Sequence, residues 1–254
     1  MEKCPGRPEQ REDRQEKVRT MTEKTCGRTG KSMMREAAEN NGHGEDFSGK
    51  VIGKAEDMLK DHMAVYPEAP MKETAAVLVP VIRKADGPAL LYERRASTLS
   101  AQPGEICFPG GRLEKGETPV QAAVRETCEE LLVREDQIRI LGQMNGVTGP
   151  AGAPVWPVVA ELSGYGGDFS TDEVGEILTV PVSWLMQNPP KIYNTYLETV
   201  PAPDFPYELI PGGRNYPWRR KIHRVWFYQF HDTVLWGLTA HITDSFIRLL
   251  EADG

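Results

Sequence analysis

One run of charged residues constrains this chain more than any other part of its sequence. Gly111-Arg112-Leu113-Glu114-Lys115-Gly116-Glu117 is followed, after seven further residues, by Arg125-Glu126-Thr127-Cys128-Glu129-Glu130. Carboxylates gathered this closely repel one another unless a multivalent cation lies among them. The run therefore predicts a metal site.

The residues around position 119 predict that a helix begins there. Thr118 precedes Pro119, and Gln121 stands three residues after the threonine, which is the pattern of a capping box with proline at the first helical position. At about 100° per residue, this helix has an apolar face and an adjacent acidic face. The apolar face holds Val120, Ala123, Val124, Thr127 and Leu131, and the acidic face holds Glu126, Glu129 and Glu130.

The spacing within the acidic face favours metal binding. Because Glu126 and Glu130 are four residues apart, we expect their Cβ atoms to lie roughly 5 to 6 Å apart, within reach of one Mg²⁺ or a bridging pair of ions. An ordinary solvated helix face is the alternative interpretation. The preceding loop Phe108-Pro109-Gly110-Gly111 and the fixed offsets to Glu117 and Arg125 favour the metal site.

The complete pattern resembles the Nudix box, in which Gly, five residues, Glu and seven residues precede Arg-Glu-x-x-Glu-Glu. The resemblance implies a hydrolase of diphosphate linkages that uses Mg²⁺ or Mn²⁺, with an α/β fold of the Nudix type, an α/β/α sandwich around a mixed β-sheet. Two positions depart from the box. Leu132 replaces a glycine, so either the helix runs one turn longer or leucine takes a left-handed backbone at a cost of about 1 kcal/mol. Thr127 replaces an apolar residue, and its hydroxyl is expected to bond back to the carbonyl four residues earlier.

The resemblance also implies roles for individual residues. Glu126 and Glu130 are the expected metal ligands. Glu129 is expected to assist as a further ligand and in catalysis, and the Gly110 carbonyl is an additional ligand. Arg125 is better placed to orient these carboxylates than to touch substrate, and Glu117 is expected to orient Arg125 or the loop.

The general base is a separate expectation. Glu173 lies in an acidic turn before an apolar run, and some relatives use a downstream loop glutamate to accept the proton of the attacking water. The alternative is a solvent-exposed loop acid.

The residues before the box resemble the coenzyme A pyrophosphatase branch of the family. The similar segments are 91–99 and 104–111, with later landmarks at 172–174 and 235–240. This resemblance implies cleavage of coenzyme A or acyl-coenzyme A to 3′,5′-ADP and (acyl-)phosphopantetheine. Ser100 and Gln102 stand where that branch usually has arginine and histidine, and serine cannot replace the charged fork of an arginine.

Two other functions therefore stay open. One is a pyrophosphatase for ADP-ribose or another nucleoside diphosphate derivative, and the other is a catalytically silent nucleotide-binding sensor. The candidates for holding substrate phosphates are Arg95, Arg94, Arg112 and the cluster 219–221. A surface salt bridge is the alternative for Arg95. For Trp236, core packing is favoured over substrate stacking.

Composition divides the chain into an arm and one domain. Residues 1–48 contain ten basic and ten acidic residues, with Val18 and Phe47 as their only Val, Ile, Leu, Phe, Tyr or Trp, so we expect this arm to be disordered. Residues 49–254, the expected single Nudix domain, carry the whole net charge of −7, which argues against a nucleic-acid partner. The arm contains too many acids for a transit peptide, and no 18-residue apolar run indicates a membrane span. The four cysteines show no CxxC spacing, which favours the cytoplasm.

Hydrophobic periodicity predicts the remaining elements. Helices are expected at 54–66 and 238–250, and a hairpin is expected from strands 74–82 and 89–95, which flank Asp86-Gly87. Further strands are expected at 138–142, 155–160 and 225–230. The proline-rich segment 201–217 is expected to cover the site or to lie at an interface, and the resemblance implies a homodimer.

Overall fold

The computed structural model describes residues 44–62, 64, 74–148 and 152–252. Residues 1–43 of the expected arm lie outside this range. The first helix, α3, spans Gly44–Leu59 rather than 54–66. It begins earlier because its buried stripe already includes Val51 and Ile52, and these continue to Ala55 and Leu59 at helical spacing.

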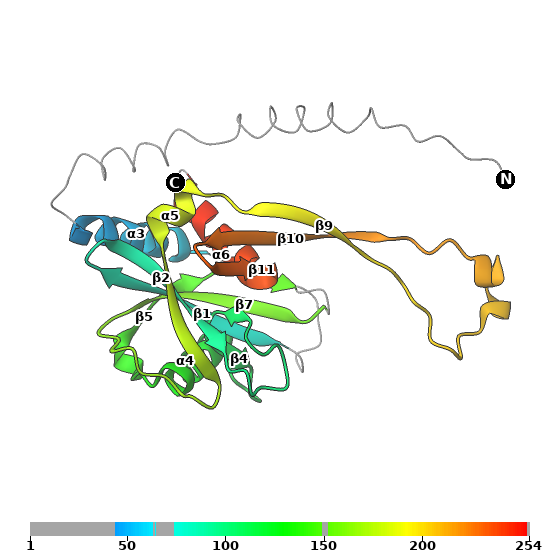
Figure 1. Cartoon of the computed structure of the whole chain (residues 1–254), viewed down its shortest axis with the longest axis horizontal. Coiled ribbons are helices and arrows are strands. Elements are labelled where there is room, and N and C mark those ends of the chain that lie inside the picture. The colour runs from blue at the N-terminus through cyan, green and yellow to red at the C-terminus, as the bar shows by residue number, and fades with distance from the viewer. Residues whose placement is uncertain (1–43, 63, 65–73, 149–151, 253–254) are drawn as a thin grey trace, which may run out of the picture. The chain divides into compact units, whose positions relative to one another are not determined.

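A mixed sheet forms the centre of the fold (Figure 1). Its main path runs β3-β2-β1-β7-β5, while β4 pairs with β1, β6 with β7 and β8 with β2. The strands are β1 (Ala75–Lys84), β2 (Gly87–Arg95), β3 (Ile106–Cys107), β4 (Gly110–Arg112), β5 (Ile138–Gln143), β6 (Val147–Thr148), β7 (Pro154–Leu162) and β8 (Val174–Pro181). β1 and β2 form the expected hairpin, and β1 runs parallel to β7.

Helices cover both faces of this sheet. On one face, α4 (Pro119–Leu131) packs in a core cluster with alternate residues of three strands, including Leu78, Leu91 and Val158. The intervening residues face the side of α3 and α6 (Gly237–Glu251), where the Tyr92 hydroxyl lies 3.0 Å from Thr243 Oγ1. The expected α/β/α sandwich with a mixed sheet is therefore confirmed. Among the described residues, no helix is long and apolar enough to cross a bilayer.

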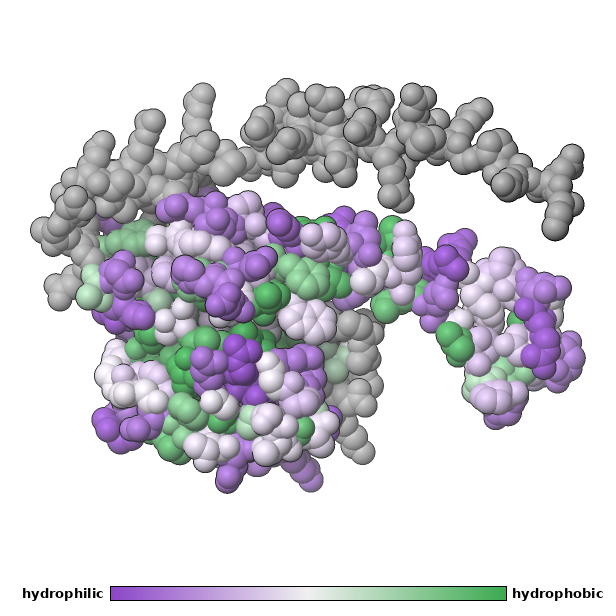
Figure 2. All heavy atoms as spheres, viewed as in Figure 1, coloured by the Kyte–Doolittle hydropathy of each residue, from purple (hydrophilic) through white to green (hydrophobic). Residues whose placement is uncertain are grey.

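A second, three-stranded sheet follows the short helix α5 (Val182–Gln187). Its order is β11-β10-β9, and the strands are β9 (Lys191–Leu197), β10 (Lys221–Phe230) and β11 (Thr233–Trp236). Segment 201–217 joins β9 to β10 and contains two short 3₁₀ helices, Tyr207–Leu209 and Gly213–Asn215. Figure 2 shows hydrophobic and hydrophilic residues together on the surface of this segment. The strand expected at 225–230 is part of β10, and the helix expected at 238–250 is α6.

Candidate active site

Helix α4 begins and ends where its local sequence directs it. Thr118 is the N-cap, its Oγ1 accepts a hydrogen bond from the Gln121 backbone at 3.3 Å, and the Gln121 side chain accepts one from the Thr118 backbone at 2.9 Å. The predicted capping box is confirmed. At the other end, Leu132 has φ 51° and ψ 37°, the left-handed conformation. The alternative of a longer helix is wrong, and leucine occupies the strained position of the usual glycine.

The packed face of α4 differs from the prediction at two points. Ala123, Thr127 and Leu131 are buried as expected, and the Thr127 hydroxyl donates to the Ala123 carbonyl at 2.7 Å, as predicted. Ala122 is also buried, as is Glu130, which is 3% exposed. Glu130 is thus a buried carboxylate rather than a member of an open acidic face.

The two glycines before the box allow close approach on two sides. A Cβ on Gly110, whose φ is 149°, would clash with the carbonyl of Ala76 in β1. A Cβ on Gly111 would clash with the carboxylate of Glu126. The Gly110 backbone N–H also donates to Glu130 Oε2 at 2.8 Å. The loop is therefore held directly against the two glutamates that the sequence singles out.

Arg125 organises the acidic residues around it. Its Nε donates to Glu117 Oε1 at 2.9 Å, and its Nη2 donates to Glu117 Oε2 at 3.1 Å. Its Nη1 lies 3.0 Å from Glu126 Oε1 and 3.4 Å from Glu129 Oε2. Hydrogen bonds from Arg125 lower the pKa of Glu117. The guanidinium thus binds carboxylates on α4 and in the preceding loop, the arrangement expected of an orienting residue.

Deeper in the site, carboxylates lie close to one another without a basic partner for each. Burial raises the pKa of Glu130, and the charges of Glu93, Glu126 and Glu173 raise it further. Burial also raises the pKa of Glu126, although hydrogen bonds and charge from Arg125 oppose this effect. Such mutual repulsion favours either a bound proton or a bound cation.

Glu173 reaches this group from a loop fixed at both of its ends. The Ser170 backbone N–H donates to the Glu130 carbonyl at 2.8 Å, and the Ala96 N–H donates to the Glu173 carbonyl at 2.8 Å. The loop is thereby tied to the end of α4 and to the end of β2. Glu173 itself is exposed, and its charge raises the pKa values of Glu93, Glu126 and Glu130. The fold therefore places it beside the α4 carboxylates.

A cavity of about 640 Å³ adjoins the glycine loop. Gly110, Gly111 and Cys107 contribute to its wall, as do residues of β9, β10 and α6. Most of the lining side chains are apolar, and the polar ones include Arg95, His223 and Arg224. Inside it, the rings of Trp226 and His241 stack with centroids 4.0 Å apart and planes 11° from parallel. Burial lowers the pKa of His241, which favours a neutral ring in this stack.

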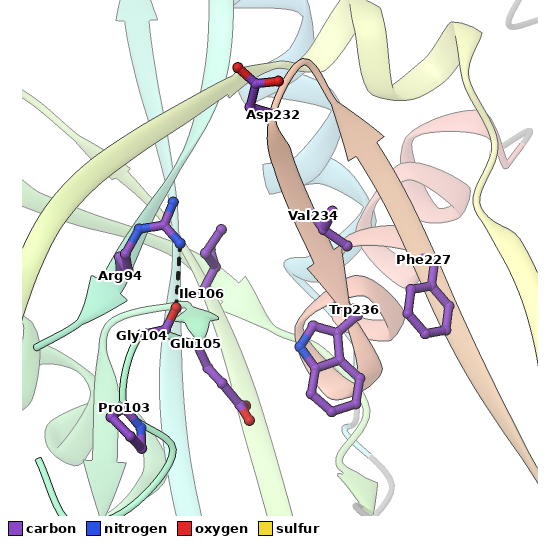
Figure 3. A pocket seen from close by; sticks show the side chains of 9 residues that line it. All are labelled: Arg94, Pro103, Gly104, Glu105, Ile106, Phe227, Asp232, Val234 and Trp236. Carbon is purple, nitrogen blue, oxygen red and sulfur yellow. Dashed lines mark hydrogen bonds between the residues drawn. The ribbon is translucent and has the colours of Figure 1, made fainter. Parts of the chain in front are cut away.

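The other two arginines expected at the substrate lie elsewhere. Arg94 lines an adjacent cavity of about 420 Å³. Its side chain binds Glu176 at 2.8 Å and donates to the Gly104 carbonyl at 3.4 Å. Figure 3 shows Arg94 across this cavity from Trp236 and Phe227. Arg112 is exposed at the end of β4, and its carbonyl accepts a hydrogen bond from Arg125.

Arg94 is thus paired with Glu176 and Arg112 is exposed, whereas Arg95 lines the larger cavity. A β-bulge at Arg94/Arg95 shifts the register there, and Arg95 Nε donates to the Ala101 carbonyl at 3.2 Å. Trp236 lines both cavities and is 44% exposed, so its expected core packing is wrong. The residues 219–221 lie at the start of β10 and before it, and Arg220 forms an ion pair with Glu198.

The donor set fits a hard divalent cation, although the side chains are not arranged around one. Within the described ranges, no three His, Cys, Asp or Glu side chains converge closely enough to hold a metal. Arg125 instead binds Glu126 and Glu129. The fit rests on chemistry: carboxylate oxygens are the ligands that Mg²⁺ prefers, and one buried carboxylate oxygen, Glu93 Oε2, has no hydrogen-bond partner in the described part of the chain.

Glu93 is the residue that sequence reasoning missed. It lies in β2, is 1% exposed, and its Oε1 accepts a hydrogen bond from the Cys107 thiol at 3.3 Å. The signal was an acid two residues after Leu91, at a position of the strand that must face the core. Such a position normally holds an apolar residue.

Comparison with known proteins gives the same assignment as the box. The NUDIX domain model matches residues 72–199, about half of the chain. The uncharacterized Nudix hydrolase NudL of Photorhabdus laumondii is 32% identical over 170 residues, which cover 66% of this chain and 80% of that protein. The uncharacterized Nudix hydrolase NudL of Citrobacter koseri is 29% identical over 177 residues, which cover 67% of this chain and 79% of that protein. A crystal structure of the Caenorhabditis elegans Ap4A hydrolase aligns with a TM-score of 0.39 and 24% identity, covering 45% of this chain and 84% of that one. The chain belongs to the Nudix family of hydrolases, which cleave diphosphate linkages.

Proposed function

We propose that this chain is a Mg²⁺- or Mn²⁺-dependent hydrolase that cleaves coenzyme A or acyl-coenzyme A to 3′,5′-ADP and (acyl-)phosphopantetheine. The large cavity beside Gly110 and Gly111 carries this proposal. Its mostly apolar wall suits the long pantetheine arm and an acyl chain, while the diphosphate would lie at the glycine loop. Arg95, in the same wall, supplies a guanidinium for a phosphate group.

The reaction follows from the charges at the site. A divalent cation would neutralise the diphosphate oxygens and polarise the attacked phosphorus. Glu126 and Glu130 would hold it, with Glu129 and the Gly110 carbonyl as further ligands. Arg125 positions Glu126 and Glu129, and Glu117 fixes Arg125 through two hydrogen bonds.

Proton transfer is assigned to Glu173. Its carboxylate would take a proton from water as the water oxygen forms a new bond to one phosphorus and the bridging P–O bond breaks. The other phosphate leaves with the bridging oxygen, so each product ends in a phosphate monoester. The backbone anchors of Glu173 hold it beside α4 while its side chain is exposed to solvent.

A second candidate substrate is ADP-ribose or another nucleoside diphosphate derivative. Ser100 and Gln102 favour it, because they remove positive charge that would bind a 3′-phosphate. A silent nucleotide sensor is the third candidate, and the complete set of box glutamates argues against it.

Separate incubations with coenzyme A, ADP-ribose and NADH, each with Mg²⁺, test these alternatives when the products are counted. We expect coenzyme A to be split fastest, into 3′,5′-ADP and phosphopantetheine. Faster cleavage of ADP-ribose or NADH would contradict the assignment of coenzyme A as the substrate but would support the hydrolysis of a diphosphate linkage. Tight binding of any of the three without turnover would select the sensor.

We also propose that the protein acts in the cytoplasm, on small molecules rather than nucleic acid or membranes, and forms a homodimer. The acidic charge of residues 49–254 and the cysteine spacing support the first two statements. Size-exclusion chromatography with light scattering tests the third.

A further inference from the structure

Glu93 is placed on the same face of the sheet as the box helix. Side chains alternate between faces along a strand. Leu91 packs in the cluster that contains Ala123 of α4, whereas Tyr92 contacts Thr243 of α6 on the opposite face. Glu93 therefore points toward the α4 side, where Glu130 is also buried.

One oxygen of this carboxylate is left without a partner. Oε1 accepts the hydrogen bond from Cys107, but Oε2 is buried and has no hydrogen-bond partner among the described residues. An unpaired buried carboxylate oxygen is costly unless a proton or a cation compensates it. By this criterion Oε2 of Glu93 calls for a proton or a cation beside it.

The charges that act on Glu93 come from α4, from the Glu173 loop and from the end of β2. The charge of Glu93 acts on Glu130, and those of Glu126 and Glu173 act on Glu93. Arg95 is the basic residue whose charge reaches Glu93, and its Nε is engaged by the Ala101 carbonyl. Four carboxylates from β2, α4 and a loop thus act on one another, and the two guanidinium groups beside them, those of Arg95 and Arg125, are engaged by the Ala101 carbonyl and by Glu117.

We propose that Glu93 is a further ligand of the divalent cation, to which it supplies its buried oxygen Oε2 from β2. The inference rests on the proposed metal-dependent hydrolysis, and it adds a ligand that lies outside the box. The chemistry selects Mg²⁺ or Mn²⁺, because both bind carboxylate oxygens. Cys107 would then act as a positioning residue, since its thiol fixes the other oxygen of Glu93.

Binding of Mn²⁺ to the full chain, followed by electron paramagnetic resonance without nucleotide, tests this ligand. We expect Glu93→Gln to weaken Mn²⁺ binding at least about 10-fold, because the amide keeps the shape and removes the charge. Glu93→Asp keeps the charge on a shorter side chain, so its Mn²⁺ affinity should lie between those of the wild type and Glu93→Gln. The matched control is Glu176→Gln in the adjacent strand β8, whose carboxylate is 52% exposed, and we expect it to bind as the wild type does.

Thermal unfolding separates a ligand from a structural residue. In EDTA, Glu93→Gln should unfold at the same or a higher temperature than the wild type, because a buried unpaired charge has been removed. Added Mn²⁺ should raise the unfolding temperature of this variant by less than it raises that of the wild type. A structural role would instead lower its unfolding temperature in EDTA.

The outcomes distinguish two failures. Equal Mn²⁺ affinity in wild type and Glu93→Gln would overturn this inference and leave the proposed function standing. Absence of Mn²⁺ binding in the wild type would overturn both. Should the glutamine variant not fold, Glu93→Asp decides, since wild-type affinity there would also overturn the inference.

Discussion

Two carboxylates are buried in opposite faces of the same sheet, and their surroundings differ. Glu161, in β7, binds Arg83 Nε at 2.6 Å and Arg139 Nη2 at 3.0 Å. Burial alone would raise its pKa, but the hydrogen bonds from the two arginines hold the pKa below its ordinary value. Glu93, in β2, has the Cys107 thiol on one oxygen and no partner in the described chain for the other, and burial raises its pKa.

The difference separates a carboxylate that two arginines bind from carboxylates that we propose bind a cation. Glu161 of β7 binds arginines of β1 and β5, and it is linked to α3 as well, because Arg139 also binds Glu56 of α3 at 2.8 Å. Glu93 and Glu130 are held close together without equivalent basic partners. Stability gained at the first position is therefore independent of ions, whereas the second group needs a proton or a cation.

The largest expected effect comes from the second group. Glu130→Gln and Glu126→Gln should each lower Mg²⁺-dependent turnover to below about a thousandth of the wild-type value, because a charged ligand is lost. Steady-state kinetics measures the turnover of each variant, and unfolding in EDTA measures its stability without the cation. Wild-type turnover in either variant would contradict the assignment, and so would a large loss of stability in EDTA for Glu130→Gln.

Glu173→Gln should have the next largest effect. We expect kcat to fall about 10²- to 10⁴-fold with substrate binding retained, because general-base catalysis is removed from an exposed loop residue. Kinetics together with calorimetric binding of a slowly hydrolysed substrate analogue measures both quantities. An unchanged kcat would show that Glu173 is a solvent-exposed loop acid and not the general base.

Glu161→Gln tests whether the carboxylate bound by two arginines contributes to stability alone. The variant should unfold with a free energy about 1 to 3 kcal/mol lower, a range reduced because both arginines are half exposed, while kcat and KM stay unchanged. Denaturant unfolding and steady-state assays give the two values. A loss of activity in a fully folded variant would break the distinction between the two carboxylates.

The smallest effect is a pH dependence of the ion-free protein. Because the pKa values of Glu93 and Glu130 are raised, the folded protein holds protons that the unfolded chain releases above the ordinary glutamate value of 4.5. Stability from these groups is complete below that value and is lost as pH rises through the raised pKa values.

A bound cation replaces those protons, so the stabilisation by Mg²⁺ should be larger at about pH 8.5 than at about pH 6. Thermal unfolding at both pH values, with Mg²⁺ and with EDTA, measures the difference. A Mg²⁺ effect that is equal at the two values would contradict the expected competition between protons and the cation.

Local signals in the sequence were sufficient for α4 and the β1–β2 hairpin. Thr118, Pro119 and Gln121 fixed the start of the helix, and the contacts of Arg125 with Glu117 and Glu126 follow from their spacing on one helix and its preceding loop. These features depend on neighbours in the chain, so the pattern alone predicts them.

Long-range contacts explain what the sequence did not predict. Strand pairing and sheet packing bring Glu93 to the α4 face of the sheet, which no local pattern reports. Arg94 is bound by Glu176, which is 82 positions away in the chain. Trp236 was expected in the core, but the second sheet leaves it between two cavities. Helix α3 also began earlier than its periodicity indicated, because Val51 and Ile52 pack in the core.

We propose above that Glu126, Glu129 and Glu130 bind a divalent cation at the glycine loop. A calorimetric titration of the full chain with Mg²⁺, with and without coenzyme A, tests it most directly. We expect saturable binding in the wild type that is lost in Glu126→Gln and Glu130→Gln. Absence of Mg²⁺ binding in the wild type under both conditions would contradict it.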